Sequence, residues 1–136
     1  MSATPPDRRP IAAREFKVVK AAASWLARRG CSANGISTAG MIFGILAGAA
    51  LCLTSRLPEH ARLCWAAAAL LIPLRLLANM FDGMVAVERG TTSRLGELFN
   101  EVPDRISDSA ALIGLGYAAG GDVALGFSAA LAAMMT

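Results

Sequence analysis

The stretch ARLCWAAAALLIPLRLLANMFD, residues 61–82, decides the fold. Residues 61–81 are mostly apolar, and an α-helix needs roughly 20 such residues to cross the hydrocarbon core of a bilayer. Its last polar residues, Arg75, Asn79 and Asp82, lie four and then three positions apart, so they share one face of a helix. Polar groups at membrane depth normally pair with one another or line a wet cavity. The stretch therefore predicts a membrane-spanning helix whose polar face is turned towards protein or water.

Three further apolar blocks cover residues 36–53, 106–119 and 123–135. The chain of 136 residues is 55% hydrophobic and 17% charged, whereas soluble domains average about 45–50% and about 25%. The last block is too short to cross a bilayer, and we expect the chain to be cut off within that helix. The predicted fold is all-α, a polytopic transmembrane helix bundle with three full spans and a truncated fourth.

The segment ahead of the first span carries most of the basic charge. Residues 1–10 are rich in proline and charge and are predicted to be a disordered N-terminal arm. Residues 11–30 have apolar side chains at helical spacing between cations, which predicts an amphipathic interfacial helix. A cytoplasmic helix packed on the bundle is the alternative. The basic bias places the N-terminus in the cytoplasm, and no cleaved signal is expected.

A second polar face follows the first. Asn100, Asp104 and Asp108 recur at intervals of four, and we expect this face to be turned towards the face that ends at Asp82. Carboxylate and amide oxygens suit Mg²⁺ or Mn²⁺, whereas zinc favours Cys or His. Since Mg²⁺ usually binds a few carboxylates together with substrate phosphates, the spacing predicts a cytoplasm-facing metal cavity for a phosphorylated substrate.

Other features of the chain have a structural interpretation. Glycines stand four apart in the first span, at Gly40, Gly44 and Gly48, which predicts close approach of another helix. Ser37 or Thr38 is expected to cap that span. The three cysteines show no paired metal spacing and are predicted to be small buried hydrophobic residues.

The polar run resembles the signature of the CDP-alcohol phosphotransferase family, D-x-x-D-G-x-x-A-R-x8-G-x3-D-x3-D. The positions that match it in spacing are Asn79, Asp82, Gly83, Ala86, Gly96, Asn100 and Asp104. Three residues depart from the pattern, because Asn79 and Asn100 stand where the signature has Asp, and Val87 stands where it has Arg. Asn keeps a carbonyl oxygen but loses the charge, so we expect weaker or fewer bound cations. Asp108 and Glu101 could restore some charge, and Arg75 or Arg89 could stand in for the missing Arg.

The resemblance implies a six-helix fold, of which residues 31–136 would be the transmembrane domain, incomplete at its C-terminus. It implies transfer of a substituted phosphate from a CDP-alcohol, expected to be CDP-diacylglycerol, to a hydroxyl acceptor, with release of CMP in phospholipid biosynthesis. Asp104 is the expected base. The expected ligands of Mg²⁺ or Mn²⁺ are Asn79, Asp82, Asn100, Asp104 and Asp108, and the expected nucleotide-binding residues are Asp82, Gly83, Ala86 and Gly96.

The resemblance also implies a bacterial-type inner membrane location, a homodimer, and lipid partners with no nucleic acid. Two other functions stay open at this stage. The Asn substitutions favour a catalytically impaired homologue that binds CDP-lipid or acts as a partner subunit. A purely structural membrane protein, in which Asn79 and Asn100 only join helices by hydrogen bonds, is the third.

Overall fold

The computed structural model describes residues 17–90 and 94–135, with the side chains of residues 94–100 outside that description. Helices make up nearly all of the described chain, and the two described ranges contain no strand. In chain order the elements are α1 (Lys17–Arg28), α2 (Ala33–Arg56), the short 3₁₀ helix η2 (Pro58–His60), α3 (Ala61–Glu88), α4 (Arg94–Gly116) and α5 (Val123–Met135).

Two segments are long and apolar enough to cross a membrane. They are α2, with a mean hydropathy of 2.0 over its most apolar window, and η2 with α3, with 1.7. Only 33% and 17% of these windows are buried, so most of their apolar surface faces outward, where a bilayer can cover it. The predicted all-α membrane bundle is therefore confirmed, while the number of spans stays a prediction.

Helix α2 begins earlier than the sequence indicated. Ser32 is its N-cap, because its Oγ accepts a hydrogen bond from the backbone N–H of Gly35 at 3.1 Å. The prediction that Ser37 or Thr38 caps this helix is therefore wrong, because both already lie one turn inside it. Thr38 donates its hydroxyl to the carbonyl of Asn34 instead.

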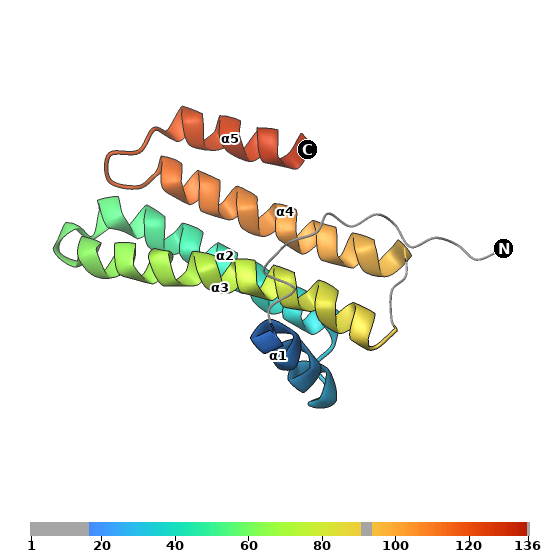
Figure 1. The fold of residues 1–136 in the computed structure, drawn as a ribbon. Helices are drawn as coiled ribbons and strands as arrows, with labels where there is room; N and C mark the ends of the chain where they lie inside the picture. The colour runs from blue at the N-terminus through green and yellow to red at the C-terminus, as the bar shows by residue number, and fades with distance from the viewer. Residues whose placement is uncertain (1–16, 91–93, 136) are drawn as a thin grey trace.

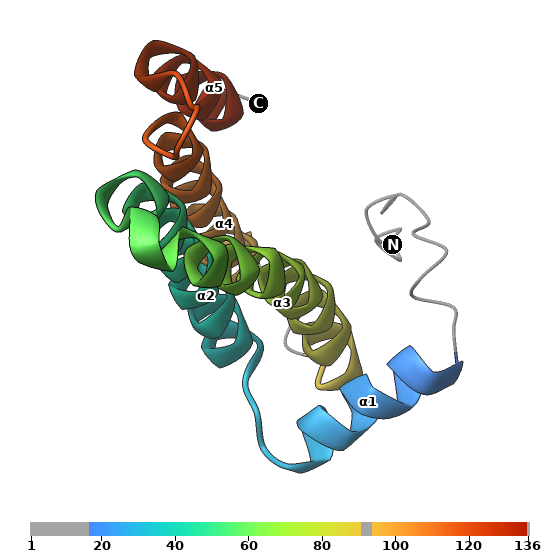
Figure 2. The same cartoon turned by 90° about the vertical axis from the view of Figure 1, so that its left-hand side faces the viewer.

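Helix α2 packs against both α3 and α4, and it crosses α3 in the view of Figure 1. Helix α5 packs on the outer side of α4, and α1 crosses the end of α3 (Figure 2). The backbones of α3 and α4 make little contact with each other, because α2 is the helix on which both are packed. Two polar faces can thus oppose each other across a gap.

The contact between α2 and α4 depends on glycine. A Cβ on Gly48 would collide with the backbone carbonyl of Ala110, and one on Gly114 would collide with the backbone of Gly48. A Cβ on Gly44 would meet Ser107 in the same way. The predicted close approach along the glycine stripe is confirmed, against α4 at Gly44 and Gly48 and against Ala78 of α3 at Gly40.

The N-terminal predictions are covered only in part. Residues 1–10 and the expected start of the amphipathic helix lie outside the described residues. From Lys17 onward, α1 exposes both Val18 and Trp25, and the Arg29 guanidinium lies 4.8 Å from the centre of the Trp25 ring. An aromatic residue beside cations is typical of the membrane interface, so the interfacial location stays a prediction that this surface favours.

Candidate functional site

Arg75 of α3 reaches across the gap to α4. Its side chain is buried, and Nε donates a hydrogen bond to Ser107 Oγ at 2.9 Å. Nη2 lies 3.3 Å from Asp104 Oδ1 and 3.0 Å from Asp108 Oδ1. One guanidinium therefore joins α3 to three side chains of α4, although the backbones of the two helices make little contact. Its single positive charge balances only one of the two carboxylate charges.

Asp82 lies about two turns beyond Arg75 on the same side of α3, where it faces α2. Its side chain is only 1% exposed, and its Oδ2 accepts a hydrogen bond from Ser37 Oγ at 2.7 Å. Because burying a carboxylate is costly without compensation, the Ser37 hydroxyl, turned inward from α2, offsets part of that cost.

Asn79 completes the contact between the two polar faces. Its side chain lies close enough to Asp104 to act on that carboxyl group, and the charges of both Asp82 and Asp108 act on it as well. The structure thus brings together four of the five predicted metal ligands, from the second half of α3 and the middle of α4.

The other residues that match the signature in spacing are Gly83, Ala86, Gly96 and Asn100. Gly96 and Asn100 lie within α4, but their side chains are outside the part of the chain that the structure describes. Ala86 lies partly buried on α3 one turn beyond Asp82. Gly83 does not end its helix, because α3 continues to Glu88.

Glu101 and Arg89, which the sequence offered as replacements for charges missing from the signature, make contacts elsewhere. Arg89 Nη1 donates hydrogen bonds to the carbonyls of Gly30 and Cys31, at 3.3 and 2.9 Å, so it holds the connection between α1 and α2. Glu101 forms an ion pair with Arg105 at 2.7 Å on its own helix. Of the two candidate arginines, Arg75 is the one that contacts the carboxylate cluster.

Gly83 and Val87 line a groove of about 410 Å³ between α3 and α1. Lys20 and Ser24 of α1 form the opposite wall. Ser24 Oγ donates a hydrogen bond to Glu88 Oε1 at 3.0 Å, which ties the two walls together. Gly83 directly follows Asp82, so the groove begins one residue along α3 from the carboxylate cluster, on a face of the helix turned about 100° away from the Asp82 side chain.

The donor types at the cluster fit a hard divalent cation. Asp82 and Asp104 offer carboxylates and Asn79 offers an amide oxygen, all of which Mg²⁺ and Mn²⁺ accept. No group of three or more His, Cys, Asp or Glu side chains that could hold a metal ion occurs among the described residues. Mg²⁺ usually binds one or two carboxylates with substrate phosphates, so the residues fit a cation that substrate completes.

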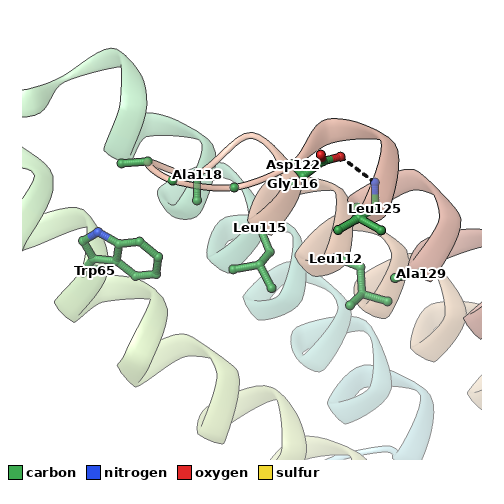
Figure 3. Close-up of a pocket in the computed structure, with 12 residues that line it drawn as sticks. Trp65, Leu112, Leu115, Gly116, Ala118, Asp122, Leu125 and Ala129 are labelled. Atoms are coloured by element: carbon green, nitrogen blue, oxygen red, sulfur yellow. Dashed lines mark hydrogen bonds between the residues drawn. The ribbon is translucent and has the colours of Figure 1, made fainter.

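A second cavity, of about 400 Å³, lies at the opposite end of the bundle between α4 and α5 (Figure 3). Leu112, Leu115 and Leu125 line it, with Trp65 on one side (Figure 3). Asp122 is the one charged residue of its described lining, and its Oδ1 accepts a hydrogen bond from the Leu125 N–H at 2.9 Å. This carboxylate caps α5, so the cavity offers apolar packing and no candidate chemistry.

Sequence reasoning missed two serines at the carboxylate cluster. Ser107 follows Asp104 by three residues and so shares its helical face, a signal that could have identified it. Ser37 was interpreted as a helix cap, and its contact with Asp82 spans 45 residues of sequence. No local pattern reports a contact of that kind.

Comparison with known proteins gives one match. The sequence model of the family described as CDP-alcohol phosphatidyltransferase matches residues 30–136. Neither a curated protein nor a solved structure matches the chain significantly. The matched range begins at the connection that precedes α2 and includes the whole carboxylate cluster.

Proposed function

Because the chain belongs to the CDP-alcohol phosphatidyltransferase family, we propose that it transfers a phosphatidyl group from CDP-diacylglycerol to a hydroxyl acceptor and releases CMP. The reaction of the family is transfer from a CDP-alcohol in phospholipid synthesis. For this chain we propose CDP-diacylglycerol as the CDP-alcohol. The observation that carries it is the meeting of Asn79 and Asp82 of α3 with Asp104 and Asp108 of α4, at and just beyond the signature positions.

Asp104 is the proposed base. Phosphoryl transfer asks a protein mainly to position the reactants, neutralise charge and accept the proton of the attacking hydroxyl. The Asp104 side chain is 29% exposed, so an acceptor can reach it, while Arg75 and Asn79 hold it in place. A carboxylate that is fixed yet accessible can accept that proton.

Members of this family generally depend on a divalent metal. We assign Mg²⁺ or Mn²⁺ to Asn79, Asp82, Asn100, Asp104 and Asp108, where a bound cation would neutralise the diphosphate of the donor. Arg75 already supplies one positive charge beside Asp104 and Asp108. We therefore expect this site to need less positive charge from bound cations than a site with the four carboxylates of the family signature. Asp82, Gly83, Ala86 and Gly96 are the proposed nucleotide-binding residues, because small residues let the nucleotide approach the backbone.

Family members are integral membrane proteins, and the two long apolar helices fit this. We place the protein in a bacterial-type inner membrane as a homodimer, with the cluster facing the cytoplasm. The basic residues ahead of α2 support this orientation, because the cytoplasmic side of a membrane protein is enriched in Lys and Arg.

A second candidate function is a non-catalytic homologue that binds CDP-lipid as a partner subunit. The contacts of Arg75 favour it, because a guanidinium between Asp104 and Asp108 takes up charge that a catalytic cation would otherwise neutralise. Asn79 and Asn100 further lower the negative charge of the cluster.

The deciding experiment is Mg²⁺-dependent CMP release from CDP-diacylglycerol by the full chain in membranes, with a panel of hydroxyl acceptors. Asp104→Asn is expected to lower the rate at least about 100-fold, because it removes the general base. Asp122→Asn is the matched control, because Asp122 lies at the end of the bundle opposite the carboxylate cluster and Asn can also cap a helix. The CMP release rate of this variant should stay unchanged. Retained CDP binding without CMP release from any acceptor would instead support the partner subunit.

A further inference from the structure

The groove between α1 and α3 lies beside the carboxylate cluster but outside the contacts just described. Gly83 and Val87 are four residues apart, so both lie on the face of α3 that lines this groove. Gly83 directly follows the buried Asp82. The Cα atoms of consecutive residues are about 3.8 Å apart, so a donor phosphate that reaches the end of α3 at Asp82 would have the Gly83 end of this groove within its length.

The α3 wall of the groove lacks the positive charge that the family signature has there. Val87 stands at the arginine position, and its side chain is 61% exposed. Lys20 lines the same groove from the α1 side. The positive charge of the groove thus comes from a residue 67 positions earlier in the chain, outside any signature spacing.

Helix α1 is held in place over this groove at two points. Ser24 donates a hydrogen bond to Glu88, and Arg89 donates one to the carbonyl of Cys31 at 2.9 Å. Glu88 is the acidic residue of the groove lining, and its carboxylate oxygen is engaged by the Ser24 hydroxyl. Since α1 is fixed to the end of α3, Lys20 is positioned over the groove by tertiary contacts.

We propose that Lys20 binds a phosphate group of the nucleotide donor in this groove, supplying from α1 the positive charge that Val87 lacks on α3. The inference rests on the proposed function, because that function provides the nucleoside diphosphate. A lysine ammonium on a flexible stem is a compact charge that suits a phosphate oxygen. The donor site would then include a helix that precedes the matched family range.

The test uses the full chain in vesicles of zwitterionic lipid. Lys20→Met is expected to raise KM for CDP-diacylglycerol about tenfold and to change kcat less than about twofold, because a contact made equally in the ground and transition states affects binding alone. Lys17→Met is the matched control, because it removes the same charge from the same helix one turn away, outside the groove lining. Its KM should change less than about twofold.

A rescue variant separates a direct contact from a general effect on α1. In the Lys20→Met background, Val87→Arg should return KM to within about twofold of the wild-type value, because it supplies a cation to the same groove from the other wall. The proposal is overturned if Lys20→Met behaves like Lys17→Met, or if Val87→Arg restores nothing.

Failure of the proposed function would look different, because the wild-type chain itself would release no CMP. Equilibrium binding of CDP would then be compared between the wild type and the two lysine variants. Binding about tenfold weaker in Lys20→Met than in Lys17→Met would support the groove assignment. Equal binding in the two variants would overturn it.

Discussion

Helix α4 contacts α2 and α3 in opposite ways. Against α2 it packs backbone to backbone through Gly48 and Gly114, with no room for a Cβ. Towards α3 it keeps its backbone apart, and the Arg75 side chain spans the separation to Asp104 and Asp108. The first interface fixes the position of α4, and the second leaves its carboxylates accessible. In this chain, therefore, the side of α4 that carries the carboxylates is the side whose backbone is not packed tightly against a neighbour.

The largest expected effect comes from breaking the tight interface. Gly48→Val should prevent recovery of a folded, monodisperse protein in detergent, because its side chain would collide with the backbone of α4 at Ala110. Overpacking of this kind costs about 1–3 kcal/mol, or more when the obstacle is backbone. Ala49→Val, at the exposed next position, should leave size-exclusion and thermal-unfolding profiles unchanged. Normal folding of Gly48→Val would mean that α4 is positioned by other contacts.

The second effect comes from removing the bridge across the open interface. Arg75→Met should lower CMP release about tenfold or more, because Asp104 and Asp108 lose their shared cation while the glycine contacts remain. The loss of thermal stability should be smaller than for Gly48→Val, since both aspartate side chains are partly exposed, at 29% and 49%.

Two controls make the Arg75 result specific. Arg56→Met removes an exposed positive charge near the far turn and should leave the rate unchanged. Arg75→Lys should give an intermediate rate, because one ammonium cannot reproduce the separate guanidinium contacts to Ser107 and to the carboxylates. An unchanged rate for Arg75→Met would mean that the bridge is structural only.

The sequence predicted the glycine contact between α2 and α4 better than the side-chain contacts between α3 and α4. Apolar blocks and the glycine stripe depend on spacing along a single helix, so they indicated α2, α3 and the close approach of another helix. Helix α5 was expected over residues 123–135 and is observed as Val123–Met135. Helix α4 begins at Arg94, well before the apolar block at residue 106, because its first half is polar in sequence and a search for apolar blocks does not register it.

The candidate site was predictable only where its residues follow a pattern within one helix. Asn79, Asp82, Asp104 and Asp108 were found from intervals of three and four. The contact of Arg75 with α4 and that of Ser37 with Asp82 each connect two helices. The spacing of residues within one helix does not show which residue of another helix a side chain contacts. The groove wall at Lys20 was missed for the same reason.

The smallest expected effect tests the link between the two interfaces. Ser37 belongs to α2, the helix of the tight interface, yet its hydroxyl donates to Asp82 in the polar cluster. Ser37→Ala should lower CMP release about threefold to tenfold, because one hydrogen bond to a charged group orients the carboxylate. Thr38→Ala is the control, since the Thr38 hydroxyl donates to the backbone of its own helix, and its rate should stay at the wild-type value.

A wild-type rate for Ser37→Ala would mean that Asp82 keeps its orientation through contacts other than the α2 hydroxyl. The tight interface would then act on the chemistry only by positioning α4, and the two interfaces would be energetically independent. Combining Ser37→Ala with Arg75→Met decides this directly, because effects that multiply indicate independent sites, whereas a smaller combined loss indicates one coupled network. Coupling is expected, because the charge of Asp82 acts on Asp104, which Arg75 contacts.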